Sequence, residues 1–157
     1  MPRREVADVQ ELKSLVGQEI ATGDWLEITQ ERIDRFGEAT SDPQWIHVDV
    51  ERCKRESPFK TTIAHGYLTL SLIPYLTQGA FGLRQPFGIT INYGSNKVRF
   101  TSPVPSGSRI RCRMTPLEVS DFASGWQVRW LVTVDIEGRD KPACVAEIIS
   151  RLYEAQG

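Results

Sequence analysis

The sequence predicts an α+β fold in which an antiparallel β-sheet wraps around one buried helix. The first half has the spacing of helices, residues 64–78 are apolar on nearly every side of a helix, and the chain after Pro86 alternates apolar and polar residues. A helix that is apolar all round is buried in a core. Long alternating strands present one apolar face, and the economical packing places that face against the helix.

The first half begins with helical elements joined by one short strand. In chain order, the pattern predicts an amphipathic helix at 4–16, a short strand within 18–28, a helix at 30–40 and a short polar helix at 49–56. Thr29 is a suitable N-cap for the second helix. Asp42 precedes Pro43, and a residue before proline avoids the helical conformation, so this helix ends there.

The second half consists of the buried helix and then the sheet. Pro74 is expected to end or kink the last turn of the helix. Alternation predicts strands at 89–93, 97–101, 109–114, 126–136 and 143–153. Turns rich in proline and glycine separate them, as at 102–107 and 137–138.

The composition is that of one globular domain. The chain has 157 residues, of which 40% are hydrophobic and 25% charged, and a chain of this length can bury a real core. We expect a single domain over residues 1–157, with residues 1–17 as an N-terminal helical extension. The net charge of −1 gives no reason to expect nucleic acid or an anionic membrane as a partner.

The cysteines and the hydropathy predict a cytoplasmic protein. Cys53, Cys112 and Cys144 are odd in number and far apart, which is typical of reduced thiols rather than of a disulfide framework or a metal cluster. The N-terminal residues lack the apolar core of a signal peptide. No apolar run reaches the roughly 18–20 residues of a membrane-spanning helix.

Asp42 and His47 are the first candidates for acid–base chemistry. The chain has only two histidines, and His47 follows Asp42 by five positions across a predicted loop. A loop of this kind can direct a carboxylate and an imidazole into one cleft, where they can hold a water molecule and move its proton. The alternative is a turn aspartate and a structural histidine, and the spacing alone favours that alternative.

His65 and Gly66 open the predicted buried helix. A glycine lets a ligand approach the main chain, and the free N–H groups of a first helical turn can act as an oxyanion hole for a thioester carbonyl. The alternative is that Gly66 only permits close packing of helix and sheet. The sequence favours neither.

Basic residues recur on two predicted strands. Arg109, Arg111 and Arg113 form a stripe that is either a solvated face or a site that attracts nucleotide phosphates, and the same two interpretations apply to Lys97 and Arg99. The four tryptophans are more typical of a core or an interface than of cofactor stacking. No dinucleotide fingerprint, P-loop or nucleophile elbow is present, so nucleotide hydrolysis and α/β-hydrolase chemistry lack support.

Three blocks of sequence resemble one known family. The run FGEATSDPQWIHVDVERC resembles the hydratase-2 motif of the MaoC-like dehydratases, whose core is G-D-x-N-P-L-H, and SDPQWIHVD resembles the branch that contains nodulation protein N. TTIAHGYLTLSLIPYL is similar to the central helix of that family, and NYGSNKVRFTSPVPSGSRIR to the strands that follow. The resemblance covers roughly residues 18–152.

The resemblance implies a hot-dog fold and a homodimer with its clefts near the interface. It implies reversible hydration of a trans-2-enoyl-CoA, or another enoyl thioester, to the (R)-3-hydroxyacyl thioester, on coenzyme A or an acyl carrier. No metal and no redox cofactor are implied.

Matched to the motif by position, Asp42 and His47 are the catalytic pair that deprotonates water and moves a proton to the α-carbon. Four further residues are expected at the oxyanion or substrate-binding site: Ser41, Gln44, His65 and Gly66. The sequence departs from the motif in having Ser41 for glycine, Gln44 for asparagine, Trp45 for proline and Ile46 for leucine.

Two rival functions remain open. A hot-dog acyl-CoA thioesterase would hydrolyse the thioester, but it needs a carboxylate directed at the carbonyl carbon, and the Asp-to-His spacing argues against it. A catalytically weak accessory protein like nodulation protein N would keep the fold without the activity, and Ser41 and Trp45 are the residues that favour it.

Overall fold

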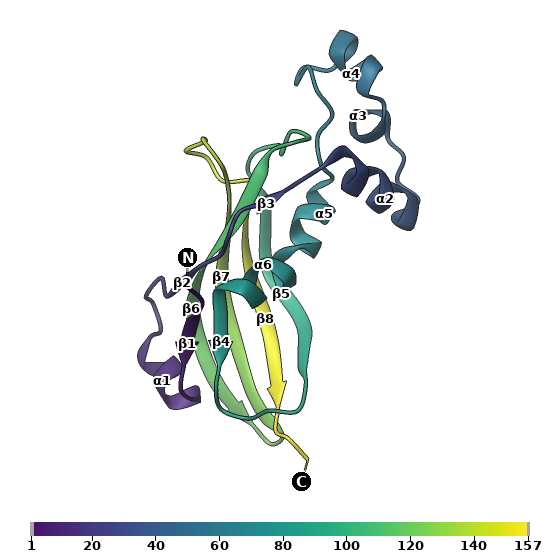
Figure 1. Ribbon diagram of the computed structural model, residues 1–157. Helices are drawn as coiled ribbons and strands as arrows, with labels where there is room; N and C mark the ends of the chain where they lie inside the picture. The colour runs from purple at the N-terminus through teal and green to yellow at the C-terminus, as the bar shows by residue number, and fades with distance from the viewer. Residues whose placement is uncertain (1, 157) are drawn as a thin grey trace.

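The computed structural model describes residues 2–156 of the chain. Its elements in chain order are β1 (Arg4–Val6), α1 (Val9–Ser14), β2 (Ala21–Thr22), β3 (Leu26–Glu27), α2 (Gln30–Thr40), α3 (Trp45–Val48), α4 (Val50–Glu56), α5 (Gly66–Ser71), α6 (Ile73–Ala80), β4 (Phe81–Leu83), β5 (Thr90–Phe100), β6 (Arg109–Phe122), β7 (Gly125–Ile136) and β8 (Cys144–Tyr153). Figure 1 shows a tall curved sheet with α5 and α6 along one face and α2, α3 and α4 beyond one end.

The main sheet is antiparallel and confirms the predicted α+β hot-dog architecture. Its strand order is β2-β6-β7-β8-β5, and β3 also pairs with β6. Buried and half-buried residues alternate along β6 and β7, so one face of each strand forms the core. The core cluster joins sheet residues such as Val132 and Val134 to central-helix residues such as Leu68 and Leu76.

The central helix differs in detail from its prediction. It consists of two segments, α5 and α6, that meet at Leu72. Pro74 lies in the first turn of α6 rather than in a last turn, a position that needs no main-chain N–H. Tyr67 and Tyr75 are exposed, so the prediction that this helix is buried on nearly every side was wrong for one side. No described helix is both long and apolar enough to cross a membrane.

The predicted N-terminal helix is shorter than expected. Residues 4–6 form strand β1, which pairs in parallel with β4, and α1 begins only at Val9. Asp8 explains the boundary, because its side chain accepts a hydrogen bond from the main-chain N–H of Glu11 (2.8 Å) and caps the helix there.

Residues 29–63, here called the overhang, extend beyond the end of the sheet (Figure 1). Thr29 caps α2 as predicted, with its hydroxyl accepting from the N–H of Arg32 (3.2 Å). The polar helix predicted at 49–56 is α4. Helix α3 was not predicted, and it occupies part of the stretch between Asp42 and His47 that the sequence suggested was a loop.

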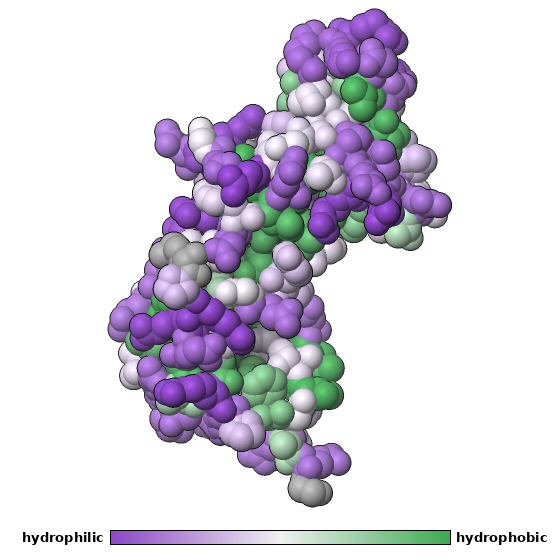
Figure 2. Space-filling model, viewed as in Figure 1, coloured by the Kyte–Doolittle hydropathy of each residue, from purple (hydrophilic) through white to green (hydrophobic). Residues whose placement is uncertain are grey.

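Strand β5 unites two predicted strands and forms an edge of the sheet. Two irregularities in its pairing with β8 separate the predicted runs. Its apolar residues were expected to face the core, but Ile91, Tyr93 and Phe100 are exposed, as is Ile89 just before the strand. Figure 2 shows apolar surface on the side of the molecule where β5 lies in Figure 1. Alternation identified the strand correctly, but it did not show that these four side chains remain largely exposed in the single chain.

Candidate functional site

Asp42 and His47 lie close together where α2 gives way to α3. One side-chain oxygen of Asp42 and one ring nitrogen of each of His47 and His65 all lie within 4.8 Å of one another. The Asp42 side chain is half exposed, at 51%, whereas His47 is buried, at 7%. Because a hydrogen bond to water spans about 2.8 Å, a carboxylate oxygen and an imidazole nitrogen at this separation can both bind one water molecule.

The two departures from the motif beside Asp42 occupy special backbone positions. Ser41 ends α2 in the left-handed conformation, with φ 54° and ψ 37°, which explains why the motif has glycine there. Trp45 is the first residue of α3, where proline is favoured because its fixed φ suits a helix and no N–H is needed. Both replacements keep the chain path that brings Asp42 and His47 together.

His47 is held in one tautomer and is kept neutral. Its Nδ1–H donates to the main-chain oxygen of Ile63 (2.7 Å), because a carbonyl can only accept, so Nε2 carries the free lone pair. Burial lowers the pKa of His47 below its ordinary value of 6.5. The bond to Ile63 opposes this shift, as does the charge of Asp42, while His65 reinforces it. The imidazole is therefore a base near neutral pH.

His65 is buried and contacts both Asp42 and His47. Its ring is only 2% exposed, and Nε2–H donates to the main-chain oxygen of Asp42 (3.0 Å). The ring stacks on that of His47, with centroids 3.8 Å apart. Gly37 makes room for this arrangement, since a β-carbon there would lie 3.0 Å from the Asp42 oxygen and 3.5 Å from the His65 ring. His65 was predicted from the sequence to lie at the oxyanion or substrate-binding site, whereas Gly37 was not among the predicted site residues.

Gly66 is the first residue of α5, and each of its two predicted roles has an observation in its favour. A β-carbon at Gly66 would lie 2.9–3.1 Å from the ring of Phe100, so glycine permits close packing here. Within the described residues, the main-chain N–H groups of Gly66 and Tyr67 have no acceptor. Two unpaired donors at a helix start are suited to an anionic oxygen.

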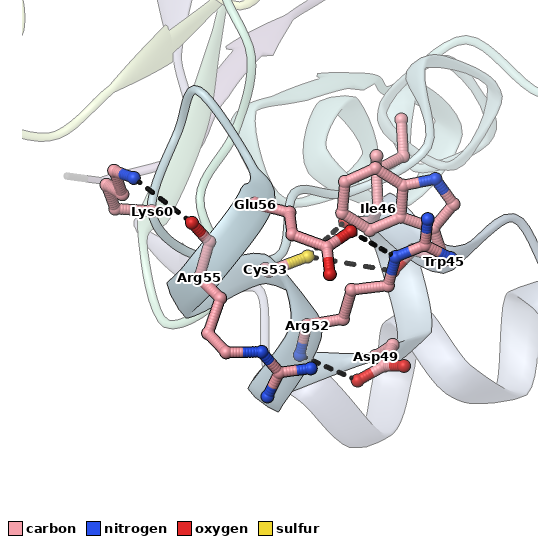
Figure 3. A network of polar contacts seen from close by, with 8 residues as sticks. All are labelled: Trp45, Ile46, Asp49, Arg52, Cys53, Arg55, Glu56 and Lys60. Carbon is pink, nitrogen blue, oxygen red and sulfur yellow. Dashed lines mark hydrogen bonds and ion pairs between the residues drawn. The ribbon is translucent and has the colours of Figure 1, made fainter.

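Trp45 of α3 contacts residues of α4 within the overhang (Figure 3). The Arg52 guanidinium lies 4.2 Å from the centre of the Trp45 ring and pairs with Glu56 at 2.7 Å. Cys53 is buried beneath them, with Sγ 3.6 Å from the main-chain oxygens of Trp45 and Ile46. Gln44 and Ser41 are exposed at the rim of the site, and the Gln44 side chain makes no capping bond.

The stacking of the histidines bears on metal binding by this cluster. A metal bound to an imidazole nitrogen lies near the plane of that ring, along its lone pair. The rings of His47 and His65 are stacked, with planes inclined by only 25° and centroids 3.8 Å apart. No single position therefore lies in both ring planes and within coordination distance of a nitrogen of each ring. A shared ion would require one ring to turn and give up its bond to Ile63 or Asp42.

An apolar cavity of about 420 Å³ lies further along the central helix. Its walls include Ile73, Pro74 and Thr77 of α6, Phe81 of β4 and Trp130 of β7. A second cavity, of about 280 Å³, lies beside Trp25 and Tyr75. Neither of these two cavities is lined by Asp42 or His47. The Asp42 side chain is half exposed, whereas the His47 side chain is buried.

The arginine stripe is a solvated face with counter-charges. Arg109 pairs with Glu137 at 3.0 Å and Arg113 with Asp135 at 2.8 Å, while Arg111 lies over the ring of Trp25 at 4.4 Å. These partners favour the structural interpretation over a phosphate site. Two further cations are exposed on β5: Lys97 and Arg99.

Comparisons with known proteins agree with this fold and this motif. The family model described as "MaoC like domain" matches residues 11–135. The chain is 46% identical over 149 residues to 3-hydroxyacyl-thioester dehydratase Z of Mycobacterium tuberculosis, covering 94% of this chain and 97% of that one. It is 42% identical over 146 residues to Nodulation protein N of Rhizobium meliloti, covering 90% and 89%.

A solved structure extends the likeness to three dimensions. The unliganded R-hydratase PhaJ1 from Pseudomonas aeruginosa superposes with a TM-score of 0.72 at 26% identity, covering 94% of this chain and 86% of that one. These matches confirm the resemblance noted in the sequence, including its nodulation protein N branch.

Proposed function

We propose that this chain, which belongs to the MaoC-like domain family, catalyses the reversible hydration of a trans-2-enoyl thioester to the (R)-3-hydroxyacyl thioester. The observation that carries the proposal is the convergence of Asp42, His47 and His65 within 4.8 Å. The names of the relatives support it, since one is a 3-hydroxyacyl-thioester dehydratase and a structural neighbour is an R-hydratase. The names of these relatives and the composition of the sequence are both consistent with a cytoplasmic enzyme of acyl metabolism.

The geometry suggests how the pair would act. Water bound between Asp42 and His47 gives a proton to Nε2 of His47, the nitrogen that the bond to Ile63 leaves free. The water oxygen forms a bond to C3 as the C2–C3 π bond breaks, and the electron pair of that bond moves toward the thioester oxygen. Protonated His47 then gives its proton to C2, which restores the thioester carbonyl and the neutral imidazole. In the reverse direction the same groups remove the C2 proton and protonate the departing hydroxyl.

The negative charge that develops on the thioester oxygen needs stabilisation. We assign this to the N–H groups of Gly66 and Tyr67, which have no acceptor among the described residues. Loss of one such donor typically raises a barrier by about 3–4 kcal/mol. Ser41 and Gln44, exposed at the rim, are the remaining candidates for contact with substrate.

The acyl chain would occupy the apolar cavity along α6. Its volume of about 420 Å³ lies within the range of small-molecule sites. Pro74 on its wall is about 12 Å from Gly66 along the helical path, at 1.5 Å per residue, so an acyl chain directed away from the thioester could reach it.

Strand β5 supports assembly as a homodimer. It is an edge strand whose apolar side chains are exposed, and such an edge is normally covered. A second copy paired along β5 would cover Ile91 and Tyr93. The second copy would also lie close to the candidate site, because Phe100 at the end of β5 packs on Gly66, and Gly66 belongs to that site.

Incubation of the protein with crotonyl-CoA tests the proposal. Loss of the enoyl absorbance without release of free thiol is expected, whereas free thiol would indicate the rival thioesterase. Asp42→Asn and His47→Ala should each lower turnover by at least about a hundredfold. Asp140→Asn, in an exposed turn, is the matched control. A loss below about tenfold in both variants, with the fold intact, would reject the catalytic assignment.

The accessory-protein alternative has less support. This alternative was based on Ser41 and Trp45, which depart from the family motif. Both residues nevertheless keep the backbone conformation that the motif requires. No turnover with enoyl thioesters from short to long chains, measured on folded dimer, would favour it instead.

A further inference from the structure

We propose that Gln30 and Thr62 are positioning residues that fix the catalytic imidazole of His47. The inference rests on the proposed function, because it assumes that His47 is the base. It concerns residues outside the motif, one at the start of the overhang and one at its end, that meet beside α3.

The side chain of Gln30 uses every polar atom it has. Its Nε2 donates to the main-chain oxygen of His47 (2.7 Å) and to Oδ1 of Asp34 (2.8 Å), while its Oε1 accepts from the hydroxyl of Thr62 (2.5 Å). These partners define the orientation of the amide. The reverse orientation would bring the amide oxygen against the oxygens of His47 and Asp34.

Thr62 connects this amide to the body of the protein. It is 1% exposed, and its main-chain oxygen accepts from the N–H of Ser106 (2.9 Å). The adjoining residues continue the connection, since Ile63 bridges to Pro105 and Ala64 donates to Val104 (2.8 Å). Gln30 therefore links the His47 backbone to a segment bonded to the turn before β6.

His47 is consequently held at two points by neighbouring residues. Ile63 accepts the bond from the imidazole, and Thr62, acting through Gln30, fixes the main-chain oxygen. Helix α3 has only four residues and no side-chain cap, so it is too short to hold its own orientation. The placement of Nε2 relative to Asp42 depends on these outside contacts.

A pair of substitutions at one position separates positioning from packing. Thr62→Val keeps the shape of the side chain and removes the hydroxyl, whereas Thr62→Ser keeps the hydroxyl. For Thr62→Val we expect kcat for crotonyl-CoA hydration to fall at least about tenfold with KM nearly unchanged, because small displacements of a catalytic group are costly. Thr62→Ser should retain most of the activity. Thr133→Val, on the half-buried face of β7, is the control.

Substitutions of Gln30 test the other end of the link. Gln30→Leu removes all three bonds, and Gln30→Glu can still accept from Thr62 but places a carboxylate against the His47 oxygen and Asp34. Both should lower kcat at least as much as Thr62→Val. Because Gln30 is only partly buried at a helix start, its variants carry the test if Thr62→Val does not fold.

A spectroscopic measurement makes the test independent of turnover. The chain has only two histidines, so nitrogen-15 NMR can follow the tautomer of His47 directly. The wild type should show Nδ1–H, and Thr62→Val and Gln30→Glu should show a mixture of tautomers. Wild-type kcat and an unchanged His47 spectrum in both variants would overturn the inference. Altered spectra in a protein that never hydrates enoyl thioesters would instead leave the link standing and reject the proposed function.

Discussion

The imidazole of His47 lies on that of His65, with ring centroids 3.8 Å apart and ring planes inclined by 25°. Nε2–H of His65 donates to the main-chain oxygen of Asp42. The buried His65 side chain therefore contacts both members of the proposed catalytic pair. Its other nitrogen, Nδ1, is buried without a partner among the described residues. An unpaired buried acceptor costs about 1–3 kcal/mol, so this nitrogen opposes the stability of the fold rather than contributing to it.

Replacement of His65 by phenylalanine should separate its two contacts. Phenylalanine preserves stacking on His47 and loses the bond to Asp42, so Asp42 becomes less ordered and kcat should fall about tenfold. His65→Ala, which loses both contacts, should lose more. Steady-state kinetics on folded protein checks the order, and equal activity of both variants and the wild type would contradict the supporting role.

The lowered pKa of His47 predicts a specific pH dependence of activity. Since the imidazole must be neutral to accept a proton, the midpoint of the decrease in kcat/KM at acid pH should lie below pH 6.5. Stability should follow the same group. The unfolded chain binds a proton at about pH 6.5 and the folded chain only below that, so the free energy of unfolding decreases as the pH falls below 6.5.

Two measurements check this dependence. A pH–rate profile should show an acid limb with an apparent pKa below 6.5. Urea unfolding at pH 7.5 and at pH 5.5 should show a smaller loss of stability in His47→Gln than in the wild type. An acid limb above 6.5 would mean that burial does not control this imidazole.

Ser41→Gly should stabilise the protein. Ser41 has φ 54° at the end of α2, a conformation that costs a residue with a β-carbon more than it costs glycine. We expect the free energy of unfolding to rise by about 0.5–1 kcal/mol, after allowance for the greater freedom of glycine in the unfolded chain. Denaturant unfolding would measure it, and a decrease in stability would show that the serine side chain contributes a compensating interaction.

Ile91→Lys should separate the subunits of the proposed homodimer. The residue is exposed on edge strand β5, where a lysine would have to be buried between two copies. Sedimentation should show a folded monomer, and hydratase activity should fall with the dimer if the second copy completes the site. Val16→Lys, an equally exposed apolar position beyond α1, is the control and should remain a dimer.

The sequence could predict those features that are encoded locally. Thr29 capped α2 as expected because a cap depends on residues within one turn, and the alternation along β6 and β7 reported their buried faces directly. Helix α3 was missed because four residues have no measurable periodicity. Alternation in β5 could not tell whether its apolar side chains face this chain or another.

The sequence predicted which residues form the candidate site better than it predicted how those residues contact one another. Asp42 and His47 were identified from the motif, but the bond from His65 to Asp42 joins residues 23 positions apart, and that from Thr62 to Gln30 spans 32. Contacts between distant positions depend on how whole elements pack, and one sequence carries no local signal of them.

Catalysis and binding of the acyl chain would take place in two separate regions of the molecule. The overhang carries Asp42 and His47 and is bonded to the turn before β6 at Pro105 and Ser106, whereas the cavity wall comes from α6, β4 and the middle of the sheet. Exchanges such as Thr77→Leu or Trp130→Phe would resize the chamber without touching the reacting groups. Such a layout allows descendants of one ancestor to diverge in the length of acyl group they accept while the chemistry stays constant.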